Sequence, residues 1–121
     1  LDINDAVAFA AYELSKFSNA KAIVAYTFSG DTARRVAKFR PSVPIVAITP
    51  NEFVANQLVL SWGVIPIVSE MVNSFEEMVN IARMKVKELG LVKELSKIVI
   101  IAGLPLKVPG NTNLIHLTDV H

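Results

Sequence analysis

The residues of this chain that are best suited to bind a ligand lie in one short stretch, Thr-Phe-Ser-Gly-Asp-Thr at 27–32, directly after an apolar run. The candidate binding residues are Thr27, Ser29, Gly30, Asp31 and Thr32. Gly30 can adopt a left-handed backbone, and the hydroxyl groups stand beside the first N–H groups of a predicted helix, which have no intrahelical partner. Such a turn can bind a phosphate group.

The same stretch has a simpler interpretation as an ordinary turn between a strand and a helix. In that case Ser29 or Asp31 caps the helix and no ligand is involved. Asp31 favours this alternative, because its carboxylate repels a bound phosphate unless the side chain points away. From the residues alone, both interpretations stay open.

A second turn-rich loop, KVPGNTN at residues 107–113, follows the fourth predicted strand. Its candidate binding residues are Gly110, Asn111 and Thr112. Because ligands of open α/β sheets bind at the carboxyl ends of the strands, this loop is expected to close over the same crevice as the first. The alternative is a tight turn into an antiparallel strand, which Pro-Gly-Asn specifies without any ligand.

Four cations alternate with apolar residues in the helix predicted at about 31–39. They are Arg34, Arg35, Lys38 and Arg40. The spacing puts them on the face opposite the buried one, so we expect a solvated face, with an intersubunit contact as the alternative. Trp62 precedes a glycine at the end of another predicted helix and is expected in the core or at an interface.

No catalytic or metal-binding motif accompanies these loops. The sequence lacks GxxxxGK[ST], GxGxxG, GxSxG and HExxH. His116 and His121 are five residues apart on or after a strand, a spacing that builds no helical metal site. We therefore predict no catalytic residue, metal site or cofactor in this chain.

Composition limits the class of protein. The 121 residues predict one domain, and 52 % apolar residues with a mean hydropathy of +0.44 predict a well-covered core. No apolar run approaches the roughly 18 residues of a membrane span, and a net charge of +1 predicts neither nucleic acid nor an anionic membrane as a partner. The absence of cysteine fits the reducing cytoplasm. A start at Leu1 rather than Met suggests a piece of a longer protein.

Apolar runs of strand length alternate with amphipathic segments along the chain. The predicted strands are 22–26, 45–48, 64–68, 98–102 and 114–117. Helical crossovers make the first four strands parallel, whereas the loop from Gly103 to Asn113 is too short for a crossover and makes the last strand antiparallel. Pro66 has no N–H to donate to a neighbouring strand, so we expect its strand near an edge of the sheet. The fold class is α/β: a three-layer α/β/α sandwich with a mixed five-stranded sheet.

Several segments, in the same order, resemble the C-terminal domain of pyruvate kinase. They run from about Asp5 to Leu117 and include the T-x-SG-x-TA, R-P-x-x-PI-x-A-x-TP and W-G-V-x-P patterns. The matching stretches are DAVAFAAYEL, AKAIVAYTFSGDTARRVAKFRPSVPIVAITPN, ANQLVLSWGVIPIV and IVIIAGLPLKVPGNTNLIHL. The resemblance implies one pyruvate kinase C-terminal-like domain over residues 1–121, with the same α/β/α architecture.

In that family, phosphoryl transfer from phosphoenolpyruvate to ADP belongs to a separate (β/α)₈ barrel that uses Mg²⁺ and usually K⁺, and nothing in this chain resembles that barrel. The C-terminal domain carries part of the tetramer interface and a site for phosphorylated effectors such as fructose 1,6-bisphosphate or AMP. By resemblance, residues 27–32 form its phosphate loop and 108–113 its closing loop. Asp31 replaces a residue that is often basic or neutral in the family.

The segment from Ala102 to Gly110 also lacks the Trp and Arg that hold a second phosphate in animal and yeast enzymes. A monophosphate effector, or none, is therefore favoured over a bisphosphate. The resemblance implies a regulatory and tetramerisation domain of a cytoplasmic glycolytic enzyme, whose partners are an effector, a catalytic barrel and further copies of itself. The alternatives are a free-standing domain that binds a phosphorylated metabolite and a structural interaction module without a ligand.

Overall fold

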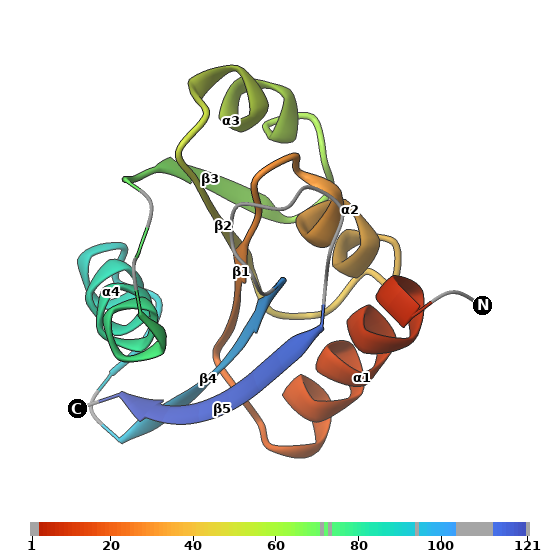
Figure 1. Cartoon of the computed structure of the whole chain (residues 1–121). Coiled ribbons are helices and arrows are strands. Elements are labelled where there is room, and N and C mark those ends of the chain that lie inside the picture. The colour runs from red at the N-terminus through yellow and green to blue at the C-terminus, as the bar shows by residue number, and fades with distance from the viewer. Residues whose placement is uncertain (1–2, 71, 73, 94, 104–112, 121) are drawn as a thin grey trace.

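The computed structural model describes residues 3–70, 72, 74–93, 95–103 and 113–120, and in this part of the chain helices and strands alternate as the sequence predicts (Figure 1). In chain order the elements are α1 (Ile3–Phe17), β1 (Ala22–Tyr26), α2 (Asp31–Ala37), β2 (Ile45–Thr49), α3 (Glu52–Leu58), β3 (Val64–Val68), α4 (Phe75–Glu88), β4 (Ser96–Ala102) and β5 (Leu114–Val120).

The strands form one mixed sheet in the order β3-β2-β1-β4-β5. The first four strands run parallel, and β5 pairs antiparallel with β4 along its whole length, from Ser96 opposite Val120 to Ala102 opposite Leu114. The predicted five-stranded mixed sheet is confirmed. The last strand extends three residues beyond the expected 117, because an edge strand can turn the polar side chain of Asp119 toward solvent and toward Lys97, 3.1 Å away.

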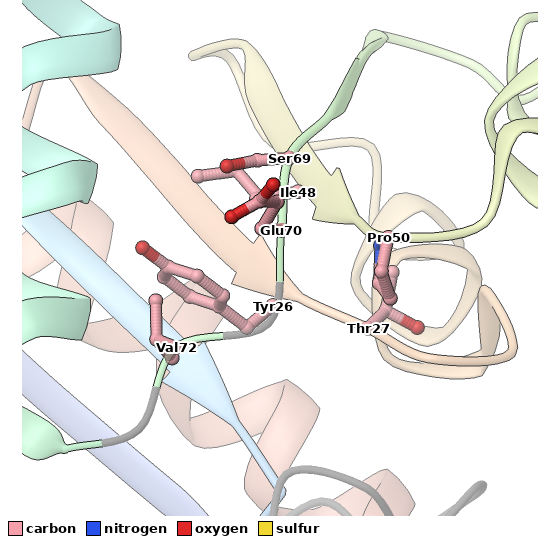
Figure 2. A pocket seen from close by; sticks show the side chains of 7 residues that line it. All are labelled: Tyr26, Thr27, Ile48, Pro50, Ser69, Glu70 and Val72. Carbon is pink, nitrogen blue, oxygen red and sulfur yellow. The ribbon is translucent and has the colours of Figure 1, made fainter.

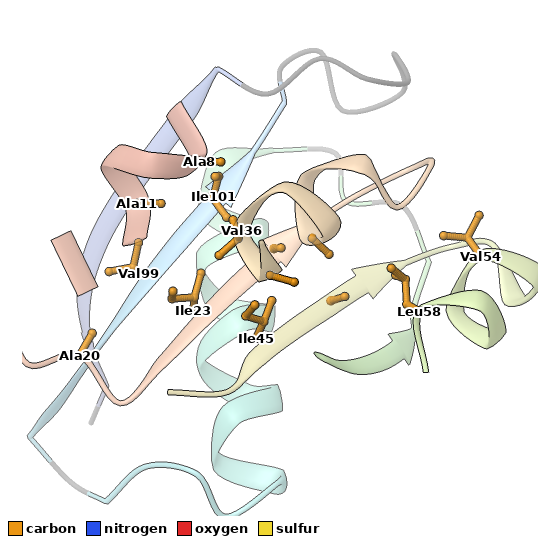
Figure 3. Packing of buried hydrophobic residues seen from close by; sticks show 14 residues of the cluster. Ala8, Ala11, Ala20, Ile23, Val36, Ile45, Val54, Leu58, Val99 and Ile101 are labelled. Atoms are coloured by element: carbon orange, nitrogen blue, oxygen red, sulfur yellow. The ribbon is translucent and has the colours of Figure 1, made fainter. Parts of the chain in front are cut away.

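Helices cover both faces of this sheet, so the predicted three-layer sandwich is also confirmed (Figure 1). Helices α1, α2 and α3 pack on one face, where their small and branched side chains meet Ile23, Ile45 and Val99 (Figure 3). Among the described residues, α4 is the helix that covers the other face, where it packs against Val24 and Ile100. Strands β1 and β2 are buried at every residue, which explains why their sequences are continuously apolar.

Side-chain caps begin α3 and α4. Asn51 Oδ1 accepts hydrogen bonds from the N–H groups of Phe53 at 2.9 Å and Val54 at 3.3 Å, and Ser74 Oγ accepts one from Glu77 at 3.1 Å. Gly90 follows α4 with a φ of 71°, as expected for a residue that ends a helix.

Helices α2 and α3 end earlier than the sequence predicts, at Ala37 and Leu58 instead of about Phe39 and Trp62. Beyond these ends the backbone forms tighter bonds that span three residues, from Arg40 N–H to Ala37 O and from Ser61 N–H to Leu58 O. The apolar periodicity continues through such turns, so periodicity by itself could not mark the ends.

The order of the strands creates one place suited to a ligand. From β1 the chain proceeds outward through β2 to β3, and α4 then carries it back across the opposite face to β4, on the other side of β1. The direction of winding therefore reverses between β1 and β4, and open α/β sheets bind ligands at the carboxyl ends of two such strands. Among the described residues, no helix has the length and apolar character that a membrane span needs.

Candidate functional site

The turn between Thr27 and Thr32 leaves the carboxyl end of β1 at this reversal point. Gly30 is the N-cap of α2 and has a φ of 93°, the left-handed backbone that its lack of a side chain permits. Its N–H donates to Thr27 Oγ1 at 2.7 Å in a buried hydrogen bond, and its carbonyl accepts from the N–H of Arg34 at 3.0 Å. The hydroxyl of Thr27 thus fixes the turn from inside.

The other polar side chains of this turn are partly buried, and one of them also accepts a hydrogen bond. Ser29 Oγ accepts a hydrogen bond from the N–H of Asp31 at 3.4 Å, although the N-cap residue is Gly30 and not Ser29 or Asp31. Thr32 is buried, whereas Ser29 and Asp31 are half-buried. The five predicted residues are therefore brought together, with Ser29 and Asp31 at the surface.

Arg34 belongs to this site, although its side chain stays 38 % exposed, as expected for the solvated face of its helix. Its Nη1 donates to Ser29 O at 3.1 Å and lies 3.7 Å from the Asp31 carboxylate. The guanidinium rests against Gly30, since a Cβ added to that glycine would be 2.8 Å from Nη1. Arg34 follows Gly30 by four residues, and helical side chains lean toward the N-terminus, so this spacing is the sequence signal that could have revealed the contact.

The neighbouring cations also contact other elements. Arg34 Nη2 donates to Gln57 Oε1 of α3 at 3.4 Å, and Arg35 Nη1 pairs with Asp5 of α1 at 2.5 Å. The arginines of α2 therefore join it to both helices on the same face of the sheet. Because these pairs are partly exposed to water, their energetic contribution is small.

The described residues on either side of the second predicted loop lie at the same edge of the sheet as the first turn. Strands β1 and β4 are parallel neighbours, with Ala25 opposite Ile101, so the segment after Ala102 leaves the same edge of the sheet as Thr27. The N–H of Asn113 donates to Ala102 O at 3.1 Å, which returns the chain to the same place. Residues 110–112, namely Gly110, Asn111 and Thr112, lie outside the described residues.

A small pocket adjoins the turn on the side of α4 (Figure 2). It encloses about 280 Å³, partly open to solvent, and its seven lining residues come from the ends of β1 and β2 and from the segment after β3: Tyr26, Thr27, Ile48, Pro50, Ser69, Glu70 and Val72. The carboxylate of Glu70 makes this pocket less suited to an anion than the turn.

Tyr26 extends toward α4 in this pocket, and its hydroxyl donates to Met78 O at 2.8 Å (Figure 2). Burial and, to a smaller degree, the nearby charge of Glu77 raise the pKa of Tyr26 above its ordinary value. The phenol therefore stays protonated and acts as a hydrogen-bond donor that ties β1 to α4.

Ser29 and Arg34 supply hydrogen-bond donors at this site. In the ranges that the structure describes, no three His, Cys, Asp or Glu side chains gather as metal ligands would. His116 packs edge-on against the ring of Phe75, with 4.9 Å between the ring centres.

Comparison with known proteins identifies the family of this chain. Residues 5–118 match the family model described as "Pyruvate kinase, alpha/beta domain". The chain belongs to the pyruvate kinase family. The resemblance drawn from the sequence is therefore confirmed.

Curated pyruvate kinases match this domain closely over a small part of their own length. The enzyme of Clostridium acetobutylicum is 42 % identical over 101 residues, which are 84 % of this chain and 21 % of that protein. The enzyme of Thermotoga maritima is 40 % identical over 119 residues, which are 98 % of this chain and 25 % of that protein. The chain thus spans about a quarter of the pyruvate kinases that it matches.

A solved pyruvate kinase structure contains the same fold. A pyruvate kinase from Cryptosporidium parvum superposes with a TM-score of 0.89 at 28 % identity, covering all of this chain and 23 % of the other. The mixed sheet with its antiparallel last strand is therefore the architecture of the pyruvate kinase C-terminal domain.

Replacement of Thr27 by valine tests whether its hydroxyl holds the turn of this pyruvate kinase domain. Thr27→Val keeps the shape but leaves the buried N–H of Gly30 without its acceptor, so we expect a loss of about 1–3 kcal/mol in the free energy of unfolding. Thr27→Ser, which keeps the hydroxyl, should lose much less of the free energy of unfolding. Urea unfolding of both variants measures the difference, and equal losses would contradict a role for the hydroxyl.

Alkaline titration tests the burial of Tyr26. Its pKa is raised in the folded domain from the ordinary value of 10.0, so above pH 10 the unfolded chain loses this proton first and the free energy of unfolding falls as the pH rises. The slope contributed by one tyrosine is at most about 1.4 kcal/mol per pH unit. Unfolding measured from pH 9 to 11 should show a smaller fall for Tyr26→Phe, and Tyr12→Phe is the control that keeps Tyr26. Equal slopes in both variants would count against the shift.

Proposed function

We propose that this chain works as the C-terminal regulatory and oligomerisation domain of a pyruvate kinase that converts phosphoenolpyruvate and ADP to pyruvate and ATP in glycolysis. The observation that carries the proposal is the family match over residues 5–118, which spans every helix and strand apart from the ends of the first and last. Catalysis, with Mg²⁺ and K⁺, belongs to a barrel domain of the parent enzyme. A cysteine-free sequence fits a cytoplasmic enzyme.

The proposed effector site is the turn Thr27–Thr32, closed by residues 108–113. The proposal is supported by the position of the turn at the reversal point of the sheet and by the left-handed backbone of Gly30 at the start of α2. It is also supported by Arg34, whose guanidinium lies over the turn and places a permanent positive charge there. A phosphorylated sugar or nucleotide fits this chemistry, with one phosphate at the turn.

Two features of the turn oppose the binding of an anion, and each is offset by a neighbouring group or by a remaining donor. The hydroxyls of Thr27 and Ser29 already accept hydrogen bonds, but a hydroxyl that accepts still carries a proton to donate, and Ser29 is half-buried at the surface. The Asp31 carboxylate lies near the Arg34 guanidinium, which offsets its charge. Binding of an effector would then favour one packing of the subunits, with a coupling free energy of about 1–3 kcal/mol.

The exposed edge of the sheet supports the proposed oligomer. Strand β5 ends the sheet after β4, and its seven residues, Leu114–Val120, include neither proline nor glycine. A long edge strand without such interruptions is a template for pairing with another chain. Two copies that pair through β5 would form a symmetric contact and join their sheets, as a closed homo-oligomer requires.

A structural interaction module without an effector is the second candidate. The observation in its favour is that Thr27 and Ser29 already satisfy N–H groups within the turn, so the turn is complete without a ligand. The two candidate functions predict different effects of added phosphate compounds on the stability of the domain.

A chimeric enzyme tests the proposed domain function. We expect that Thermotoga maritima pyruvate kinase, with its matching segment replaced by this chain, converts phosphoenolpyruvate and ADP at a kcat within about tenfold of the parent, a barrier change below about 1.4 kcal/mol. The matched control carries the Clostridium acetobutylicum segment instead. An inactive chimera beside an active control would refute the proposal.

Thermal unfolding tests the effector site. A phosphorylated sugar or nucleotide at 100 times its Kd should stabilise the domain by about 2.7 kcal/mol. Ser29→Asp keeps an acceptor for the N–H of Asp31 but adds a negative charge, so the shift in Tm should disappear. Ser42→Asp, before β2 at the opposite edge of the sheet, is the control and should keep the shift. If neither fructose 1,6-bisphosphate, AMP nor sulfate stabilises the unaltered chain, the structural module is the better description.

A further inference from the structure

Gln57 of α3 contacts Arg34 beside the turn, although the two residues are 23 positions apart in the sequence. Its side-chain oxygen, Oε1, accepts a hydrogen bond from Arg34 Nη2 at 3.4 Å, and Gln57 is exposed. A long hydrogen bond at the surface adds little to the stability of the fold. We therefore expect this contact to act on the orientation of Arg34.

The guanidinium of Arg34 is held at two of its nitrogen atoms. Nη1 donates to Ser29 O on the turn at 3.1 Å, and Nη2 donates to Gln57 on α3. A group held at two atoms has much less freedom to rotate than a group held at one. A Cβ built on Gly30 would lie 2.8 Å from Nη1, 2.9 Å from Cζ and 3.0 Å from Nη2. These nearly equal distances place the plane of the guanidinium over the glycine of the turn.

Asp31 is a competing partner for the same guanidinium. Its carboxylate lies 3.7 Å from Arg34 Nη1, which is close enough for attraction but beyond hydrogen-bond distance. An arginine and a carboxylate three positions apart on a helix can form a closer pair with two parallel hydrogen bonds. Such a pair would draw the guanidinium away from the turn and neutralise the charge that an anion needs.

The amide of Gln57 holds Arg34 without neutralising it. An amide oxygen carries no net charge, so the hydrogen bond at Nη2 leaves the positive charge of the guanidinium in place. The next residue, Leu58, is fully buried in the core against the sheet. The core therefore fixes the end of α3 on which Gln57 lies, and Gln57 is a firm support for a long and flexible side chain.

We propose that Gln57 is a positioning residue of the effector site: it holds the Arg34 guanidinium over the turn and prevents a close pair with Asp31. The charge of Arg34 then faces a phosphate group at the turn. The inference rests on the proposed function for the existence of this site, and it adds a residue of α3 that determines the affinity of the site. By linkage, an anion that favours this orientation of Arg34 strengthens the contact with α3 by the same factor.

A double-mutant cycle that combines Gln57 with Asp31 tests the proposal. NMR titration of the chain measures the Kd of inorganic phosphate, AMP and fructose 1,6-bisphosphate for each variant. Gln57→Met keeps the length of the side chain but removes the acceptor, and we expect it to weaken binding about fivefold. In the Asp31→Asn background the competing charge is absent, so the same change should weaken binding less than about twofold.

Two further variants separate positioning from a general effect on α3. Asn56→Leu is the control, because Asn56 is the exposed neighbour of Gln57 and the new side chain has a similar shape. It should leave the Kd within about twofold of the unaltered chain. Gln57→Glu should weaken binding more than Gln57→Met, since a second carboxylate beside Arg34 neutralises the charge that the anion needs.

The dependence on Asp31 decides between the outcomes. A loss of affinity that shrinks in the Asp31→Asn background supports the proposal. An equal loss in both backgrounds, no loss in Gln57→Met, or tighter binding by Gln57→Glu overturns the inference and leaves the proposed effector site standing. If none of the three compounds binds the unaltered chain, the effector site itself is refuted and the inference falls with it.

Discussion

Burial of the central strands on both faces is the constraint on which this structure depends. Every residue of β1 and β2 is buried, so helices must cover both faces of the sheet. Parallel strands joined by helices then have all their carboxyl ends at one edge. The turn after β1 and the carboxyl end of β4 therefore lie at the same edge of the sheet.

The turn at the edge is built mainly from its own backbone and from two side chains that hold it. Thr27 satisfies the N–H of Gly30 from inside, and Arg34 covers the same glycine from outside. The hydrogen bond of Tyr26 to α4 anchors the strand that leads into the turn. A ligand at this place would therefore meet donors that are already positioned, which lowers the entropic cost of binding.

The two edges of the sheet differ in what they offer to another chain. Strand β5 contains neither proline nor glycine, although Arg83 of α4 donates to its Asp119 O at 3.0 Å, while β3 combines Pro66 with exposed apolar side chains and the cation Arg40. Sheet edges that are left unpaired attract other chains, and proline removes the donor that such pairing needs.

The sequence by itself determined the fold class, the strand directions, the caps at Asn51 and Ser74 and the edge position of Pro66, because apolar periodicity and local hydrogen bonds depend on neighbouring residues. It also located the turn at 27–32, whose role as an effector site stays a prediction, as does the contribution of 110–112. Tertiary structure decided the rest: Arg34 reaches Gln57 across 23 positions, and Tyr26 reaches Met78 across 52. Such contacts depend on how helices pack on the sheet, which no local pattern records.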